Sequence, residues 1–457
     1  METVLQQLTR GNALFLILIL GIGGSFQAGY HMTSISSPSP FIKHFINSTW
    51  YERYAVPPPG STITIIWSLI VSMFAVGGLL GAISVKSFSG LLGRKKAVIC
   101  NSFIAIAAAT IMLTSKWAKS YEMIIVARIL FGYSAALGMS THLMYLSEMS
   151  PRKLRGAVTM TSATFASFGK LSAQFMGLSE ILGRQELWNV VLCVPACLSV
   201  VHVMVMPYLP EAPRYLFIEK RDDKGCQKAL QSLWGQGNFK QEMEEMLTEQ
   251  ATMEAAPTKS PLLLLQDQTV RWQLITMSTI YCCNQLSGMS VVSTFAFDIF
   301  RRAGIPTDQI RYITVGLGVT EMITSISCGS NAWAPYLTAV LIILFIIFFS
   351  GGPGAAAGTL NSEIFIQSNR VSSFVLFGIQ RWSVFAVMGL AFPILIDALD
   401  TYCFVIFACM SLLGCIYIFF LLPETKGKTL LEISDQFKAI TVCGKSFQEE
   451  SQMETKL

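Results

Sequence analysis

The stretch SEMSPRKLR occupies residues 147–155, and its spacing returns in SEIFIQSNR, residues 362–370. In both stretches an arginine follows the glutamate by seven residues. A Pro-Glu pair later ends an apolar segment in each half. Glu211 lies 63 residues after Glu148, and Glu424 lies 61 residues after Glu363. Spacing that recurs over such distances indicates an internal duplication, and two parallel repeats are typical of transporters.

The composition between these landmarks is typical of a membrane protein. The chain of 457 residues is 52% hydrophobic and 13% charged, with a mean hydropathy of +0.53, whereas soluble domains carry about 25% charged residues. The eleven cysteines are odd in number and most lie inside apolar runs, which argues against a disulfide framework. The net charge of +5 is small for this length and gives no indication of nucleic-acid binding.

Ten apolar runs approach or exceed the roughly 20 residues that a membrane-spanning helix needs. A shorter run over 313–328 is ambiguous, because a run of that length need not span. The predicted spans lie near 12–31, 62–85, 97–115, 122–146, 157–179, 188–209, 272–299, 334–362, 371–396 and 401–422.

A polar segment separates two hydrophobic halves. It opens with EKRDDK at 219–224, and QEMEEM at 241–246 is typical of an exposed amphipathic helix. We therefore expect an all-α polytopic membrane protein. Its predicted parts are an N-terminal transmembrane half, 1–217, a cytoplasmic helical linker, 218–271, a C-terminal transmembrane half, 272–423, and a cytoplasmic tail, 424–457.

The basic residues predict the orientation of the chain. They gather in the loops at 94–96 and 152–155 and in the linker, and by the positive-inside rule this side is cytoplasmic. The loop 32–60 then faces outside, and it contains the glycosylation sequon that begins at Asn47. We expect Asn47 to be glycosylated, both termini to be cytoplasmic, and the chain to lie in the plasma membrane.

The second half is shorter than the first. Each half is predicted to have a helix break with glutamine and glycine near its start, at 27–29 and at 285–288. Gly29 precedes Glu148 by 119 residues, whereas its counterpart Gly288 precedes Glu363 by only 75. The basic loop at 93–95 also has no counterpart. The second half is therefore predicted to be truncated by about 44 residues, or about one and a half helices, near 328–331.

Five motifs resemble the sugar-transporter branch of the major facilitator superfamily, and the resemblance covers nearly the whole chain. It implies the major facilitator fold, in which two six-helix halves enclose a midplane solute site. Gly358 stands where the main glucose carriers have a tryptophan, which resembles the fructose-type class II group and implies a hexose, such as fructose or glucose, or urate as the solute. The motifs are LGRK at 92–95, EMSPRKLRG at 148–156, PEAPRYL at 210–216, NQLSG at 284–288 and PETKG at 423–427.

Polar side chains inside apolar helices are the candidates for solute contact. They are costly in lipid and usually face a cavity, and amides suit a sugar or urate ring because they both donate and accept hydrogen bonds. The alternatives are hydrogen bonding between packed helices and, for the tryptophan, a position facing lipid. Ala163, Ser290 and Phe385 depart from the amides that contact sugar in the family, which weakens the expectation of hexose binding. The predicted binding residues are Gln27, Asn284, Gln285, Ser290, Gly358 and Trp382.

Charged residues at the cytoplasmic helix ends are predicted to form a gate. Charge pairs there, Glu148 with Arg155 and Glu363 with Arg370, would close the outward-facing state and separate in the inward-facing state. The alternative is simple anchoring at the membrane interface. Each solvated pair contributes only ~1 kcal/mol, but several together bias two states that differ by a few kcal/mol. The predicted gating residues are Arg94, Glu148, Arg155, Glu211, Arg214, Glu363, Arg370 and Glu424.

The most direct hypothesis is a uniporter that works by alternating access. One alternative is a truncated form that does not transport, or that regulates an intact carrier; another is proton-coupled transport through His31, because an imidazole titrates near neutral pH. No constellation of catalytic or metal-ligating residues occurs, so we expect no enzyme activity, no metal and no cofactor. The expected partners are a small-molecule solute and membrane lipid, with no nucleic acid.

Overall fold

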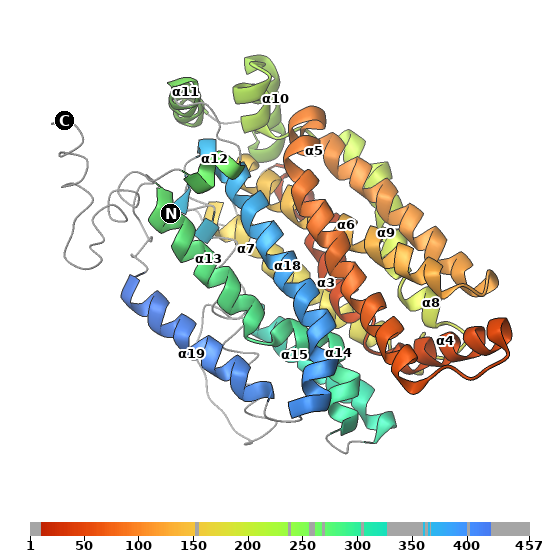
Figure 1. Ribbon diagram of the computed structural model, residues 1–457. Helices are drawn as coiled ribbons and strands as arrows, with labels where there is room; N and C mark the ends of the chain where they lie inside the picture. Colours follow the sequence, from red (N-terminus) through yellow and green to blue (C-terminus); the bar gives the residue numbers. More distant parts are fainter. Residues whose placement is uncertain are drawn as a thin grey trace.

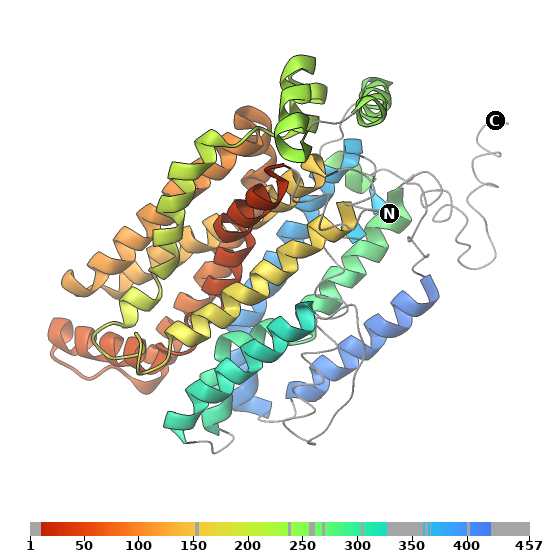
Figure 2. The same cartoon turned by 180° about the vertical axis from the view of Figure 1, so that it is seen from behind.

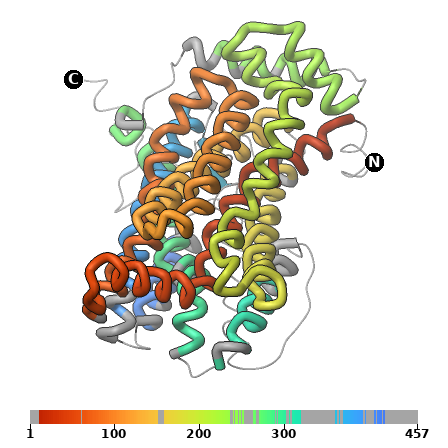
Figure 3. Tube along the Cα trace, turned by 90° about the vertical axis from the view of Figure 1, so that its right-hand side faces the viewer, coloured from red at the N-terminus to blue at the C-terminus, as the bar shows by residue number. Residues whose placement is uncertain are grey.

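The computed structural model describes residues 11–150, 155–235, 239–255, 261–266, 270–302, 306–326, 360–361, 364–365, 367–399 and 403–421. The elements described there are helices, and they pack into one elongated bundle (Figure 1). The short helices α10, α11 and α12 lie at one end, here called the linker end (Figures 1 and 2). Helix α4 lies across the opposite end, here called the α4 end (Figure 3).

The helices have the following bounds. The first half contains α2 Ala13–Gly23, α3 Ser25–Thr33, α4 Ser39–Tyr54, α5 Gly60–Trp117, α6 Tyr121–Met149, α7 Arg155–Met176, α8 Trp188–Val191, α9 Val194–Val205 and the short turns Met206–Tyr208 and Tyr215–Glu219. The linker contains α10 Asp223–Trp234, α11 Lys240–Ala255 and α12 Pro261–Gln266. The second half contains α13 Arg271–Leu286, α14 Met289–Arg302, α15 Thr307–Ile326, α18 Gln367–Leu399 and α19 Cys403–Leu421.

Five of the described stretches are long and apolar enough to cross a membrane. The other predicted spans fall on α7, on α13 with α14 and on α19, while 334–362 lies almost entirely outside the described residues. The prediction of an all-α membrane protein is therefore confirmed. The five stretches are Ala13–Thr33, Thr62–Trp117, Tyr121–Met149, Trp188–Tyr208 and Asn369–Phe392.

Helix α5 is two membrane-spanning helices joined at Gly93. A straight helix of its 58 residues would be about 87 Å long, against a hydrocarbon core of ~30 Å. The backbone reverses at Gly93, which has φ 81° and ψ 175°. A positive φ favours glycine, and a Cβ there would also lie 2.8 Å from the Tyr215 ring. The break thus falls in the predicted basic loop.

The first helix breaks earlier than the sequence indicates. The chain departs from helical geometry at Gly24, between α2 and α3, whereas Gln27 and Gly29 lie inside α3. Gly29 is instead a point of close contact, since a Cβ there would lie 2.0 Å from the carbonyl oxygen of Ala166 in α7. The predicted break in the second half does fall at Gly288, which has φ 82°.

The linker docks onto the first half. Helix α10 buries Cys226, Leu230 and Leu233 in a cluster that includes Leu16 of α2. The Trp234 indole donates a hydrogen bond of 3.0 Å to the carbonyl of Met149, at the end of α6. The segment between the halves is therefore packed against the end of the bundle, with α11 containing the predicted amphipathic helix at 241–246.

The ambiguous run near 313–328 is a full helix. Helix α15 has 20 residues and is therefore about 30 Å long. It is longer than the apolar run in the sequence because its first turns consist largely of polar residues. The sequence leaves open whether this stretch spans; its helix is as long as the ~30 Å hydrocarbon core, although it is not among the five described stretches that are both long and apolar enough to cross. Arg311 contacts Ser179 just beyond α7, and Gly318 lies against Gln174 inside α7. Helix α15 therefore runs antiparallel to α7, from the α4 end towards the linker end.

Candidate functional site

The two halves meet where α18 packs along the part of α5 that precedes Gly93. Trp382 is 4% exposed, and its ring makes an edge contact with Phe74 at a centroid distance of 5.6 Å. Gly78 permits this approach, since a Cβ there would lie 2.3 Å from the indole. Phe385 extends the same aromatic cluster. Trp382 is thus buried between the halves and not on an outer, lipid-facing surface.

Polar groups gather at the break between α13 and α14. Gln285 is 3% exposed and accepts a hydrogen bond of 3.1 Å from the Ser290 hydroxyl across Gly288. Leu286 packs against the apolar cluster that contains Trp382, so this break borders the interface between the halves. Two predicted binding residues, Gln285 and Ser290, are therefore direct neighbours, and the half-buried Asn284 precedes them.

Gln27 occupies a different environment. Its amide is buried and donates a hydrogen bond of 2.8 Å to the Ser199 hydroxyl of α9, within the first half. This geometry favours the alternative of hydrogen bonding between packed helices. Gly358 lies outside the described residues, so its predicted contact with solute stays a prediction.

At the α4 end, polar contacts join one half to the other. Lys43 of α4 forms an ion pair of 3.0 Å with Asp298 of α14. The Thr294 hydroxyl donates to the carbonyl of Met32, at a distance of 3.4 Å. Beyond α7, Glu180 accepts a hydrogen bond of 2.8 Å from the Tyr312 hydroxyl of α15. The halves are therefore held together at this end of the bundle.

At the linker end, Arg94 organises a buried charge cluster. Its Nε and Nη2 donate to one carboxylate oxygen of Glu148, at 3.0 and 2.7 Å, and Nη2 also lies 2.7 Å from Glu219. The guanidinium stacks over the Tyr215 ring at 4.6 Å. Arg94 and Glu148 are 3% and 5% exposed. Arg155 was the predicted partner of Glu148, but its side chain lies outside the described residues. The ion pair that the structure describes for Glu148 is formed with Arg94, another of the predicted gating residues.

Glu211 joins the same region through the backbone. Its Oε1 accepts hydrogen bonds from the backbone N–H groups of Lys95, at 2.9 Å, and Ala212, at 3.0 Å. Burial raises the pKa of the Glu211 carboxyl, while these two hydrogen bonds oppose the rise. Arg214 is buried nearby, at 6% exposure. These contacts tie the Gly93 turn to the chain that follows α9, all within the first half.

The second predicted gate is described only in part. Arg370 is 4% exposed and donates a hydrogen bond of 3.4 Å to the carbonyl of Phe365. Glu363 and Glu424 lie outside the described residues, so gating by these side chains remains a proposal.

Two arginines inside the bundle were missed by the sequence analysis. Arg128 of α6 is 1% exposed; it donates 3.2 Å to the carbonyl of His31 and lies 4.4 Å over the Phe74 ring. Arg381 of α18 precedes Trp382 and reaches Met139 of α6. The available signal was one arginine inside each of the apolar runs 122–146 and 371–396, because such charges are rare in spanning helices and usually functional.

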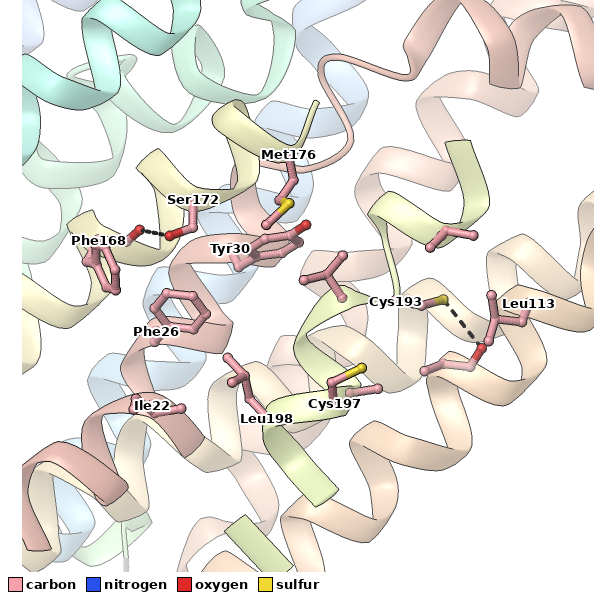
Figure 4. A pocket seen from close by; sticks show the side chains of 14 residues that line it. Ile22, Phe26, Tyr30, Leu113, Phe168, Ser172, Met176, Cys193, Cys197 and Leu198 are labelled. Carbon is pink, nitrogen blue, oxygen red and sulfur yellow. Dashed lines mark hydrogen bonds between the residues drawn. The ribbon is translucent and has the colours of Figure 1, made fainter. Parts of the chain in front are cut away.

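A cavity of about 550 Å3 lies within the first half, among α2, α3, α5, α7 and α9 (Figure 4). Its lining is almost entirely apolar, and its hydroxyls are engaged. Ser172 donates to the carbonyl of Phe168, at 2.8 Å, and Tyr30 donates to that of Val191, at 2.7 Å. The cavity therefore offers little to recognise a polyhydroxylated solute.

Comparison with known proteins agrees with this architecture. The family model described as "Sugar (and other) transporter" matches residues 16–330 and 325–437. Solute carrier family 2, facilitated glucose transporter member 9 of Mus musculus is 37% identical over 454 residues, covering 92% of this chain and 84% of that protein. Member 11 of the same family from Homo sapiens is 34% identical, covering 94% of each chain.

Solved structures agree in fold. A major facilitator superfamily proton:xylose symporter bound to 6-bromo-6-deoxy-D-glucose has a TM-score of 0.78 at 18% identity, covering 93% of this chain and 99% of that chain. The packed halves and this likeness define the major facilitator fold, and the sugar-transporter relatives and family model identify an integral membrane transporter rather than an enzyme. The family match extends over both halves, and the chain belongs to the sugar transporter family.

Proposed function

We propose that this chain is a facilitative uniporter for a hexose, such as fructose or glucose, or for urate. The observation that carries the proposal is the pairing of Gln285 with Ser290 at the α13–α14 break, beside the interface between the halves. Amide and hydroxyl groups at a helix break supply neutral donors and acceptors where a solute crosses. The relatives named as facilitated glucose transporters support the same solute class.

Alternating access is the proposed mechanism. In this arrangement polar contacts between the halves, including Lys43–Asp298 and Thr294–Met32, hold the α4 end closed. The Arg94 cluster instead lies within the first half, where it keeps the linker end of that half rigid as the halves rock. We assign the α4 end to the outside and the linker end to the cytoplasm of the plasma membrane, following the basic residues and the Asn47 sequon.

Uptake kinetics test this site. Gln285→Ala, made in a version with about 44 residues restored near 328–331, should raise the KM for the transported solute by about two- to tenfold, since one lost solute hydrogen bond contributes about 0.5–1.5 kcal/mol. Gln27→Ala is the matched control: it removes an amide bonded to Ser199, so it should reduce the amount of folded protein and leave KM unchanged. The opposite pattern, with KM sensitive only to Gln27, would place the solute inside the first half.

A non-transporting or regulatory form is the second candidate, and two observations favour it. Leu360 packs with a cluster that includes Leu264 of α12, at the linker end, and α15 also runs towards that end. A return to the same end requires two crossings, about 40 residues, but only the 33 residues 327–359 are present. The family match also divides at 325–330. Both observations support a missing segment there.

Proton coupling through His31 is the least supported option. The imidazole is 2% exposed and stacks on Phe131 at 4.2 Å. The Arg128 guanidinium donates to the His31 carbonyl, so a proton on the imidazole would place a second positive charge in the same buried site. That arrangement disfavours His31 as a proton carrier.

A further inference from the structure

Arg381 is a positive charge at the meeting point of three helices. It lies near the middle of α18, and its Nη1 is 3.5 Å from the Met139 sulfur of α6, in the other half. Its guanidinium is 5.9 Å from the centroid of the Trp382 ring, and the preceding Gln380 bonds to Ser278 of α13, at 2.9 Å. The side chain thus lies between the halves and is only partly buried.

This charge has no carboxylate partner among the described residues. A thioether is a weak acceptor, so the Met139 contact does not neutralise a guanidinium. Arg128 is a second buried cation without an ion pair in the described part of the chain. The two cations lie at the ends of one series of contacts, Arg128 over Phe74, Phe74 against Trp382, and Trp382 beside Arg381. Among the described residues, this series of contacts therefore carries two positive charges without a carboxylate partner.

We propose that Arg381 is a specificity-determining residue, and that the carrier takes a small organic monoanion whose acidic edge binds this guanidinium. The inference rests on the proposed carrier function and narrows its solute class to a sugar acid or urate in preference to a neutral hexose. A guanidinium presents parallel N–H donors that match a carboxylate or a planar anionic edge. Charges inside a membrane persist where they pair with such a group or face a water-filled path.

Ligand binding to the detergent-purified chain tests the proposal without requiring transport. Sodium gluconate, sodium urate and fructose are titrated against the wild type and against Arg381→Gln, and binding is followed by thermal stabilisation. The Kd of the two anions should rise about tenfold or more in the variant, the range for a hydrogen bond to a charged group. The Kd for fructose should rise clearly less. Arg53→Gln, which removes an arginine at the surface of the α4 end, should not change the ratio of anion to fructose affinity.

Three outcomes decide the matter. A fall in anion affinity relative to fructose, confined to Arg381→Gln, supports the proposal. An equal fall for anions and fructose overturns it, as does a wild type that binds fructose but neither anion. If Arg381→Gln does not purify as a folded protein, Arg381→Lys decides instead, because it keeps the charge and removes the forked geometry; an unchanged ratio there overturns the proposal. Binding without uptake would leave this inference standing and contradict the proposed uniport.

Discussion

The Arg94 cluster gives a quantitative prediction for stability. Arg94→Ala removes two hydrogen bonds to Glu148, an ion pair to Glu219 and the contact over Tyr215. Glu148 is 5% exposed, so the variant leaves a buried carboxylate without its cation and close to a second carboxylate. Breaking a buried pair by removing one partner costs about 3–5 kcal/mol. We expect a loss of that size in the free energy of unfolding.

The assay is unfolding in mixed micelles, followed by tryptophan fluorescence. Arg53→Ala is the matched control, because Arg53 pairs with Glu122 at 2.5 Å but the side chains are 35% and 50% exposed. Exposed pairs contribute about 0.2–1 kcal/mol, so the control should lose far less stability. Equal losses in the two variants would refute the reasoning that burial makes the Arg94 cluster a structural element of the first half.

Three further predictions concern single residues. Burial raises the pKa of Glu211 above the ordinary glutamate value of 4.5. The contribution of Glu211 to stability therefore falls as the pH rises from 4.5 through the raised pKa, and Glu211→Gln should become more stable relative to the wild type over this pH range. A difference in unfolding free energy that does not change with pH would contradict the prediction. Asn47 is exposed on α4, so an N-glycosidase should shift the gel mobility of the wild type but not of Asn47→Gln; no shift in protein that reaches the secretory pathway would count against the assigned orientation. His31→Asn should leave the dependence of uptake on pH unchanged between about pH 5.5 and 7.5, and a flattened profile would restore proton coupling.

The sequence predicts the architecture well because hydropathy and charge are direct physical constraints on a membrane chain. The spans, the reversal at Gly93 and the break at Gly288 follow from apolar length, a basic loop and glycine. Helix α15 was underestimated because its first turns are polar. The first break was misplaced because Gly24 and Gly29 look alike in sequence, although one ends a helix and the other admits a neighbouring backbone.

The candidate site is predicted less completely, because pairing depends on tertiary packing. Spacing within SEMSPRKLR indicated Arg155 as the partner of Glu148, whereas the described contact comes from Arg94 in another loop. Gln27 and Gln285 are both amides in apolar helices, yet one bonds to Ser199 inside a half and the other lies at the break beside the interface. No sequence pattern distinguishes these two environments.

Solute uptake in parallel by this chain and by a version with about 44 residues restored near 328–331 tests the central claim most directly. Both are reconstituted at equal surface density, and uptake of fructose and of urate is measured per molecule. The account predicts saturable uptake by the restored version and a small fraction of it by this chain, because the 33 residues 327–359 are fewer than the about 40 that two crossings need. Equal uptake per molecule would show that the additional residues are not needed, and no saturable uptake by either version would contradict the assignment as a solute carrier.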